Sequence, residues 1–489
     1  MNFEGLRKIV SKKNFNAFAN SFVSKYLNII VQLISMMVLA RLLTPEDYGL
    51  YSITFIFTLF ASLLKEFGVA GYIIKEEVIT KEKLASCFSL MLMAGTLSAV
   101  TLYFFATPIA EFYERETLIP MLQLLALNVG LSPFGTIVDS VLRRKMEFFP
   151  LTLCSLASSI LSSAVMIYLA FSGYGAMSLV YGALAQTISY IVLIQAFRPS
   201  IVPRTPSLKY FGDVFHYSKY SGTSNIFGQL GNYSSELIVG KLYTMEILGF
   251  LSKANSVVTM FNKLFFDAMA QVISPLIAST KRSNNREVIR SIKTITNVQL
   301  NFAWPFFMLL GLLSDPVIYI LLGEQWLEVT DLLIILCISR LGYSIFQHIN
   351  PILMGLGLAK SVMRIEVASN ISRITILLLT AHYGIEAMLI SVAVVNTVLR
   401  TSMYLPLINS ELQIPIKTYL SWLFKPLLCT FISISPVALT RTFAPEWQNN
   451  ITLYIAVILL TMATWFVLLS KQPAAIVLKS IMGNFTNKN

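Results

Sequence analysis

Residues 149–171 read FPLTLCSLASSILSSAVMIYLAF, and residues 176–197 read AMSLVYGALAQTISYIVLIQAF. Neither run contains a charged residue, and each is about as long as a helix must be to cross the hydrocarbon core of a bilayer. Only residues 172–175 separate the two runs. The pair therefore predicts two consecutive transmembrane helices, and similar runs continue in both directions along the chain.

The composition of the 489-residue chain agrees with this pattern, because 55% of its residues are hydrophobic and only 13% are charged. In a soluble globular protein about a quarter of the residues are charged. A soluble enzyme, a disordered chain and a fibrous protein are thereby excluded. The chain is predicted to be an all-α, polytopic membrane protein, since ten-residue alternating segments are absent.

Apolar runs recur often enough to predict fourteen transmembrane helices. They lie near residues 17–40, 47–67, 84–107, 118–141, 149–171, 176–197, 217–240, 247–275, 293–313, 329–355, 361–381, 385–408, 419–440 and 450–470. The ninth and tenth are the least sharply defined, because Asp315, Pro316 and Gly323 interrupt that region.

The distribution of Lys and Arg predicts the orientation of these helices. With the N-terminus in the cytoplasm, the cytoplasmic segments hold 23 Lys and Arg residues, and the outer segments hold only Arg41, Arg115, Lys241 and Arg441. Cytoplasmic loops of membrane proteins carry such an excess. We therefore expect an inner-membrane protein with both termini in the cytoplasm, and the net charge of +12 does not indicate nucleic-acid binding.

The largest connection, RPSIVPRTPSLKYFGDVFH at 198–216, follows the sixth span and is rich in Pro and polar residues. It predicts a division of the chain into lobes. We expect an N-terminal lobe over 1–200, a cytoplasmic linker over 201–216, a C-terminal lobe over 217–411, and two additional helices with a cytoplasmic tail over 412–489.

Two segments 200 residues apart resemble each other. LARLLTPEDYGLYS at 39–52 aligns without gaps with VGKLYTMEILGFLS at 239–252, and both join the first and second helix of their half. Five positions are identical, among them Thr44/Thr244 and Gly49/Gly249. Because six spans separate the copies, they have the same orientation, which predicts a parallel repeat about an axis along the membrane normal.

Polar stripes follow one face of the first helix in each half. Asn28 and Gln32 continue a stripe that includes Ser21 and Lys25, and the second stripe contains Asn225, Gln229, Asn232 and Glu236. Such stripes must face protein or water, because lipid cannot satisfy them. Two interpretations stay open: the stripes line a polar cavity, or they are buried polar contacts between helices.

The motifs LLTPEDYGLYS (42–52), KEFGVAGYIIKEE (65–77), LLGEQW (321–326) and ILMGLGLAKS (352–361) resemble the Wzx-type oligosaccharide flippases of bacteria. These proteins belong to the MOP superfamily, together with the MATE exporters and the lipid II flippase. The resemblance covers nearly the whole chain, and it is strongest to the colanic acid and teichuronic acid exporters.

This resemblance implies two six-helix lobes around a central cavity, with two extra C-terminal helices. It implies movement of undecaprenyl-pyrophosphate-linked oligosaccharides from the cytoplasmic to the periplasmic leaflet. It also implies partner glycosyltransferases and a polysaccharide polymerase of the same pathway, besides the membrane lipids themselves.

Such a substrate needs fixed cations for its phosphates and polar groups for its sugars. Charges within spans are the natural candidates, because they are costly in a bilayer. The cationic candidates are Lys25, Lys263, Arg340, Arg373 and Arg400. The polar candidates for the cavity wall are Asn28, Gln32, Asn225, Gln229, Asn232, Gln347 and Asn396. The acids that could couple transport to an ion are Glu236, Asp267 and Glu366.

Helical spacing separates these candidates further. Lys263 and Asp267 are four residues apart and could neutralise each other. Glu366 shares a face with Arg373, which is thereby partly paired. Arg340 and Arg400 have no acid three or four residues away, so they are the preferred phosphate ligands.

Other functions lack the residues that they need. The chain has no G-x-x-x-x-G-K-[ST] loop, so ATP hydrolysis within it is excluded. Its four Cys and three His are dispersed, so neither a metal site nor a cofactor is expected. A MATE-like drug exporter is the first alternative, but its cationic substrates favour an acidic cavity. A membrane glycosyltransferase or polymerase is disfavoured by the short outer loops.

Overall fold

The computed structural model describes residues 12–66, 69–203, 205–261, 273, 277, 285–443 and 451–470. Within this part, the regular secondary structure is entirely helical. The chain divides into two compact units, which are Met1–Ser252 with Leu321–Gln325 and Lys253–Ile320 with Trp326–Asn489. The predicted all-α class is confirmed.

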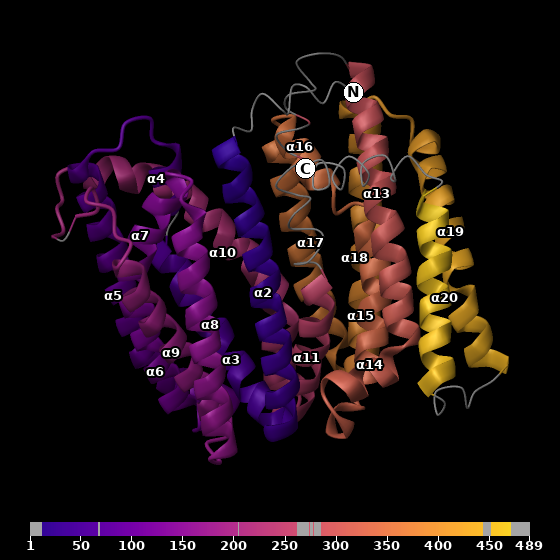
Figure 1. The fold of residues 1–489 in the computed structure, drawn as a ribbon, viewed down its shortest axis with the longest axis horizontal. Helices are drawn as coiled ribbons and strands as arrows, with labels where there is room; N and C mark the ends of the chain where they lie inside the picture. Colours follow the sequence, from indigo (N-terminus) through magenta and orange to yellow (C-terminus); the bar gives the residue numbers. More distant parts are fainter. Residues whose placement is uncertain are drawn as a thin grey trace. The chain divides into compact units, whose positions relative to one another are not determined.

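The first unit contains nine helices and the beginning of a tenth in the part of the chain that is described (Figure 1). They are α2 (Lys12–Leu42), α3 (Pro45–Glu66), α4 (Val69–Lys75), α5 (Lys81–Tyr113), α6 (Leu118–Leu131), α7 (Pro133–Arg144), α8 (Phe148–Phe171), α9 (Ala176–Gln195), α10 (Phe211–Leu242) and α11 (Met245–Phe261). Within it, α2 packs along α8, α8 pairs with α9, and α5 packs against α3 and α6.

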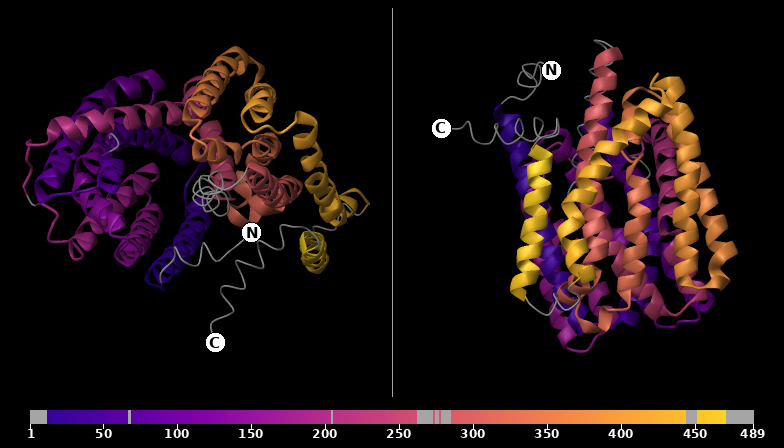
Figure 2. Two further views of the ribbon diagram at one scale, coloured as in Figure 1. Left: turned by 90° about the horizontal axis from the view of Figure 1, so that it is seen from above. Right: turned by 90° about the vertical axis from the view of Figure 1, so that its right-hand side faces the viewer.

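The second unit begins at Lys253, within α11, and continues to the end of the described chain, except for Leu321–Gln325. Its helices are α13 (Asn285–Leu312), α14 (Ser314–Leu321), η2 (Glu324–Trp326), α15 (Val329–Ser344), α16 (Ile349–Gly355), α17 (Ala359–Thr380), η3 (Ala381–Tyr383), α18 (Ile385–Glu411), α19 (Ile416–Phe443) and α20 (Ile451–Ser470). Here α13 packs against α15 and α19, α17 pairs with α18, and α19 pairs with α20. Figure 2 shows the helices of each unit running alongside one another.

Thirteen of the fourteen predicted spans coincide with a described helix or with two helices separated by a short break. The span at 247–275 begins with α11, and most of it beyond Phe261 lies outside the described residues. Among the described residues, eight helical segments are long and apolar enough to cross a membrane, and the pair α6 and α7, bent by 43°, would make a ninth. The more polar α17 falls outside this set, because Asn, Ser and charged residues interrupt its apolar run. The polytopic architecture is therefore confirmed.

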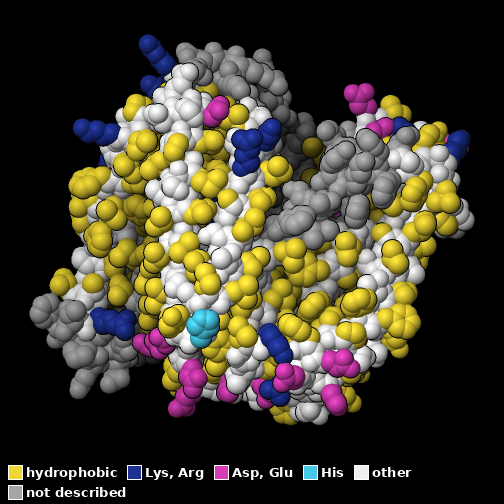
Figure 3. Space-filling view, turned by 180° about the vertical axis from the view of Figure 1, so that it is seen from behind, with side chains coloured by type: hydrophobic (Ala, Val, Ile, Leu, Met, Phe, Trp, Pro, Cys, Tyr) yellow, Lys and Arg dark blue, Asp and Glu magenta, His cyan; other side chains and the backbone are white. Residues whose placement is uncertain are grey.

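Apolar side chains cover the helices between their ends. On the face drawn in Figure 3, hydrophobic side chains dominate the middle, and most acidic and basic side chains lie towards the two ends. This distribution matches a bilayer whose hydrocarbon core meets the middle of the helices and whose head groups meet the ends.

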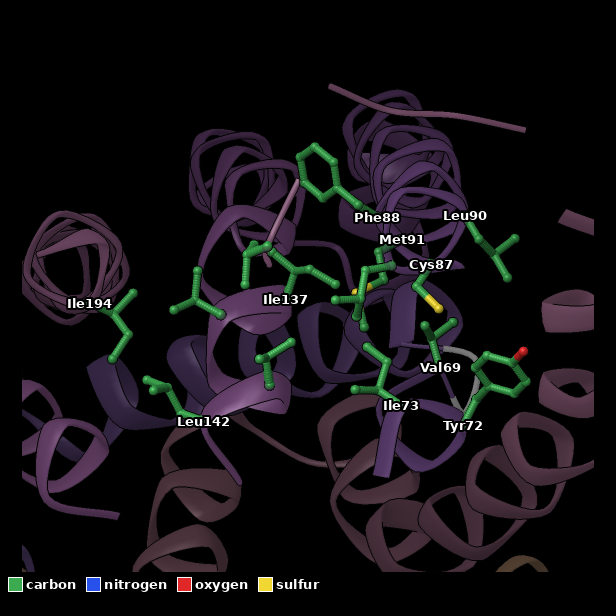
Figure 4. Close-up of a cluster of buried hydrophobic side chains, with 14 of the residues drawn as sticks. Val69, Tyr72, Ile73, Cys87, Phe88, Leu90, Met91, Ile137, Leu142 and Ile194 are labelled. Carbon is green, nitrogen blue, oxygen red and sulfur yellow. The ribbon is translucent and has the colours of Figure 1, made fainter. Parts of the chain in front are cut away.

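A buried cluster holds one end of the first unit together. It joins α4, α5 and α7 through Val69, Ile73, Met91 and Ile137, and it extends to Ile194 at the end of α9 (Figure 4). Because α4 and α7 are each short and separated from their neighbours by a break, this apolar contact fixes their positions.

The TPED turn explains how α3 begins. Thr44 and Asp47 form a reciprocal cap: the Thr44 amide donates to Oδ2 of Asp47 (2.9 Å), and the Asp47 amide donates to the Thr44 hydroxyl (3.2 Å). The other oxygen of Asp47, Oδ1, accepts the amide of Ala176 at the start of α9 (2.8 Å). One carboxylate therefore caps two helices that start 131 residues apart in the sequence.

The connection between α9 and α10 is bound to the first unit. The Ser207 amide donates to the Ser89 hydroxyl (2.7 Å), and the Tyr210 amide donates to the Ser86 hydroxyl (3.0 Å), so both bonds hold it on α5. Ser207 and Tyr210 of the predicted linker at 201–216 thus lie on α5, and the linker's last residues, from Phe211, belong to α10. The boundary between the two compact units comes later, after Ser252. The expected lobe limits stay a prediction.

Candidate functional site

A buried ion pair joins α17 and α18 in the second unit. Arg400 donates to both carboxylate oxygens of Glu366, with its Nη2 at 3.0 Å from Oε2 and its Nη1 at 3.3 Å from Oε1. The Arg400 side chain is only 5% exposed, whereas that of Glu366 is 34% exposed. The pair therefore presents its acidic half outward and keeps its cation inside.

Two further side chains fix the carboxylate. Asn350, at the start of α16, donates its Nδ2 to Oε1 of Glu366 (2.8 Å). The Tyr404 hydroxyl, one turn beyond Arg400 on α18, donates to Oδ1 of Asn350 (2.6 Å). The resulting chain of hydrogen bonds connects α16, α17 and α18 and holds the guanidinium of Arg400 in one orientation.

The ring of Tyr343 lies next to both Arg400 and a second cation, Arg340. The guanidinium carbon of Arg400 lies 4.9 Å from the ring centre of Tyr343, and that of Arg340 lies 5.6 Å from the same centre. The negative face of an aromatic ring attracts cations over such distances. Arg340 on α15 and Arg400 on α18 therefore meet at one tyrosine.

A break between α15 and α16 shapes this region. The Ser344 carbonyl accepts Nε2 of Gln299 (3.1 Å), and the Ile345 carbonyl accepts the Tyr419 hydroxyl (2.8 Å). A broken helix in a membrane requires such substitutes for the lost backbone hydrogen bonds. Side chains of α13 and α19 thus stabilise the turn that precedes Asn350.

His348 lies inside this turn and is almost fully buried. Its Nε2 lies 2.7 Å from the hydroxyl of Thr296 on α13. His348 therefore forms a buried polar contact with α13.

The structure brings together three of the predicted second-half residues, Arg340, Arg400 and Glu366. It corrects the view of Arg400 as a cation without a partner, because the partner comes from the neighbouring helix. It also shows Glu366 paired with Arg400, where the sequence spacing had suggested Arg373. An i to i+4 rule detects only partners on one helix.

The remaining second-half candidates lie near this network or beyond description. Gln347 is half-buried in the turn between α15 and α16, Asn396 is one turn before Arg400 on α18, and Arg373 is two turns beyond Glu366 on α17. Lys263 and Asp267 lie outside the described residues.

The polar stripes on the first helix of each half are described only in part. On α10, Asn232 donates to Gln229 (3.3 Å), and Glu236 is buried. On α2, Asn28 is half-buried and Gln32 is exposed. Lys25 and Asn225 are in α2 and α10, but their side chains lie outside the described part.

Sequence reasoning missed Lys65, which is 3% exposed at the end of α3. Its Nζ donates to the hydroxyl of Ser132 (2.7 Å), the residue at which α6 bends into α7. The only available signal was an intramembrane cation at the end of an apolar run. Tyr343 and Asn350 were also missed, because neither is charged.

The network in the second unit has the chemistry of an anion site. Two guanidinium groups and one carboxylate leave a net positive charge next to tyrosine and asparagine donors. Guanidinium groups bind phosphate through several hydrogen bonds at once, and hydroxyl and amide groups suit sugars. The carboxylate of Glu366 would have to release Arg400 before that guanidinium could bind an anion with the same nitrogen atoms.

The chain is similar to proteins that are described by roles in biosynthesis. Residues 38–331 match the family model described as polysaccharide biosynthesis protein. The chain is 24% identical over 315 residues to the teichuronic acid biosynthesis protein TuaB of Bacillus subtilis, covering 63% of this chain and 64% of that one. It is 22% identical over 338 residues to the succinoglycan biosynthesis transport protein ExoT of Rhizobium meliloti, covering 67% and 66%. The match thus spans just under two thirds of either relative.

Solved structures give the fold. The lipid II flippase MurJ, in an inward closed conformation, superposes with a TM-score of 0.72 at 16% identity, covering 94% of this chain and 99% of that chain. The comparisons point to membrane transport proteins rather than enzymes, and they confirm the resemblance inferred from the motifs. Since the family model matches more than half of its residues, the chain belongs to the polysaccharide biosynthesis protein family of multi-pass membrane proteins.

Proposed function

We propose that this protein moves undecaprenyl-pyrophosphate-linked oligosaccharides from the cytoplasmic to the periplasmic leaflet of the inner membrane, by alternating access. The products would serve the synthesis of a capsule, exopolysaccharide or O-antigen. The observation that carries the proposal is the meeting of Arg340 and Arg400 at Tyr343 inside the second unit of a chain from this family. Two cations at one place suit a pyrophosphate.

The orientation follows the charge distribution, with both termini in the cytoplasm. In that orientation export of an anion has a ready energy source. A pyrophosphate diester carries about two negative charges, and moving each out of a negative interior gains roughly 2.3 kcal/mol per 100 mV. Glu366 is the acid best placed to couple transport to an ion, because its partly exposed side chain is paired with Arg400, the proposed phosphate ligand.

The names of the relatives support the substrate class. One is described as a teichuronic acid biosynthesis protein and another as a succinoglycan biosynthesis transport protein. The second name also states a transport role in that biosynthesis. We infer that glycosyltransferases and a polymerase act before and after this protein in one pathway.

The test is deletion of the gene in its native host, followed by mass spectrometry of the extracted polyprenyl lipids. We expect one undecaprenyl-pyrophosphate glycan to accumulate and its periplasmic appearance to stop. Complementation with Arg340→Ala or Arg400→Ala should restore less than a tenth of the surface glycan at normal membrane levels, whereas Arg364→Ala, an exposed arginine on α17, should restore it fully.

No accumulation together with unchanged surface glycan would sink the proposal. Export of small organic cations, the activity of a MATE-like exporter, would then be the next activity to measure.

A further inference from the structure

A proline inside α13 removes a backbone hydrogen bond that a side chain of α20 replaces. Pro305 has no N–H, so it cannot donate to the carbonyl of Asn301, four residues earlier in the helix. The indole Nε1 of Trp465, on α20, donates to this carbonyl instead (2.8 Å). The ring of Trp465 also meets that of Phe302 edge to face, with 5.1 Å between the ring centres. A tryptophan of the last described helix thus completes the backbone of α13.

Another proline is served from within its own helix. In α19, Pro436 cannot donate to the carbonyl of Ile432, and the hydroxyl of Ser435 donates to that carbonyl (2.8 Å). Asn301 is almost fully buried, so its carbonyl cannot rely on water for a replacement donor. Because this donor comes from a different helix, the middle of α13 depends on where α20 lies.

The same stretch of α13 supports the break between α15 and α16. Nε1 of Trp304 donates to the carbonyl of Leu341 (3.1 Å), and Nε2 of Gln299 donates to that of Ser344 (3.1 Å). These two carbonyls lie on either side of Tyr343 in the sequence, and the ring of Tyr343 lies next to both cations of the candidate site. The turn that carries this ring is therefore held by α13.

A continuous set of contacts runs from α20 to the candidate site, and all of it lies within the second unit. The two donors to the turn are two residues before and three residues after Asn301, and Pro305 directly follows the second of them. A helix bends readily at a proline, and such a bend moves the residues on its two sides relative to each other. The bond from Trp465 therefore acts at the point of α13 on which both donors depend.

We propose that Trp465 is a positioning residue for the candidate anion site. By donating to the carbonyl whose helical donor Pro305 removes, it fixes the part of α13 that holds the turn around Tyr343. The inference rests on the proposed function, because the purpose of the positioning is to bind a phosphate at that turn. Trp465 acts through α13, and the two additional C-terminal helices thereby contribute to a site that they do not line.

Hydrogen exchange in the purified full-length protein tests this route without substrate. Trp465→Phe keeps a ring beside Phe302 and removes the N–H. The amides of residues 341–350 should then exchange about 2- to 10-fold faster, the range for loss of one hydrogen bond. Thr464→Val is the matched control, because it removes a contact of α20 with α19, at 3.3 Å from the carbonyl of Ser433. It should leave the exchange of these amides unchanged.

Restoring the backbone donor should abolish the effect. Pro305→Ala gives residue 305 an N–H for the carbonyl of Asn301, so Trp465→Phe in that background should change the exchange of the turn by less than about twofold. Equal acceleration in both backgrounds would show that the indole acts by packing alone. That result, no acceleration in the native background, or equal acceleration by Thr464→Val would each overturn the proposal.

Binding of the extracted lipid-linked oligosaccharide separates this inference from the proposed function. Trp465→Phe should raise the Kd about 2- to 10-fold, and Pro305→Ala should again remove the difference. If exchange behaves as expected and the wild type binds no lipid-linked oligosaccharide, the control of the turn by Trp465 stands and the proposed cargo is wrong. If the wild type binds the cargo and Trp465→Phe leaves the Kd unchanged, the cargo stands and the positioning role is overturned.

Discussion

Arg400 and Glu366 pair across two helices, with two hydrogen bonds of 3.0 and 3.3 Å between one guanidinium and one carboxylate. The cation is buried and the acid is about one third exposed. The guanidinium is therefore enclosed more completely than the carboxylate that pairs with it.

Because the buried cation depends on this carboxylate, the effects of replacing the two residues on stability should not be additive. Glu366→Gln leaves Arg400 buried without its counter-charge and should destabilise the protein by about 2 kcal/mol, within the range for hydrogen bonds to charged groups. Adding Arg400→Met should recover part of the loss, since an apolar replacement of a buried pair is often neutral. Thermal unfolding midpoints in detergent measure both. Strictly additive losses would show that the two groups are not coupled.

Tyr343 should act through its ring. Tyr343→Leu removes the aromatic face shared by Arg340 and Arg400 and should weaken substrate binding roughly 2- to 30-fold, which corresponds to about 0.5–2 kcal/mol of cation–π attraction. Tyr343→Phe keeps the face and should bind nearly as well as the wild type. Equilibrium binding of the extracted lipid-linked oligosaccharide distinguishes the two, and equal losses would assign the effect to the hydroxyl.

Asp47 should support two helices at once. Asp47→Ala removes the caps of α3 and α9 and should cost about 1–2 kcal/mol for each. Asp47→Asn keeps one acceptor and should cost less. Hydrogen exchange at Ala176 should accelerate in the alanine variant. If exchange changes only near Thr44, the bond to α9 is unimportant.

Glu114 predicts a small dependence of stability on pH. The hydrogen bond from Lys241 (2.8 Å) and its charge lower the pKa of this carboxyl, which follows α5 at the surface. A group with a lowered pKa stabilises the fold above its unfolded pKa, and that contribution disappears as the pH falls through the folded value. The pH range over which this stabilisation is lost therefore lies below the ordinary carboxyl pKa of 4.5.

Lys241→Gln supplies the comparison for that prediction. The difference in unfolding temperature between wild type and variant should be constant near neutral pH and should shrink as the pH falls below about 4. A difference that persists at the lowest pH would assign it to another contact, such as that of Lys241 with the ring of Phe112.

Hydropathy alone predicted the helices, because a span must be long and apolar whatever it packs against. It could not predict the bends. The break at Ser132 between α6 and α7, and the turn before Asn350, interrupt the backbone without interrupting the apolar run. Side chains of other helices replace the lost backbone hydrogen bonds. Gln299, for example, donates to the carbonyl of Ser344.

In the candidate site, too, the sequence predicted which residues matter but not how they pair. Arg340, Arg400 and Glu366 could be selected as costly intramembrane charges, but their pairing depends on how α15, α17 and α18 pack. The repeat likewise singled out Gly49 and Gly249 by their offset, and only the fold shows that each lies against the other copy's backbone.

The double cap of Asp47 also bears on biosynthesis. The start of α3 is synthesised long before Ala176, so the second oxygen of this carboxylate waits for most of the first six spans to leave the ribosome. Insertion of α9 then supplies the amide that completes the pair. The order of synthesis therefore determines when α3 is complete: the Asp47 carboxylate gains its second partner only when α9 is in place.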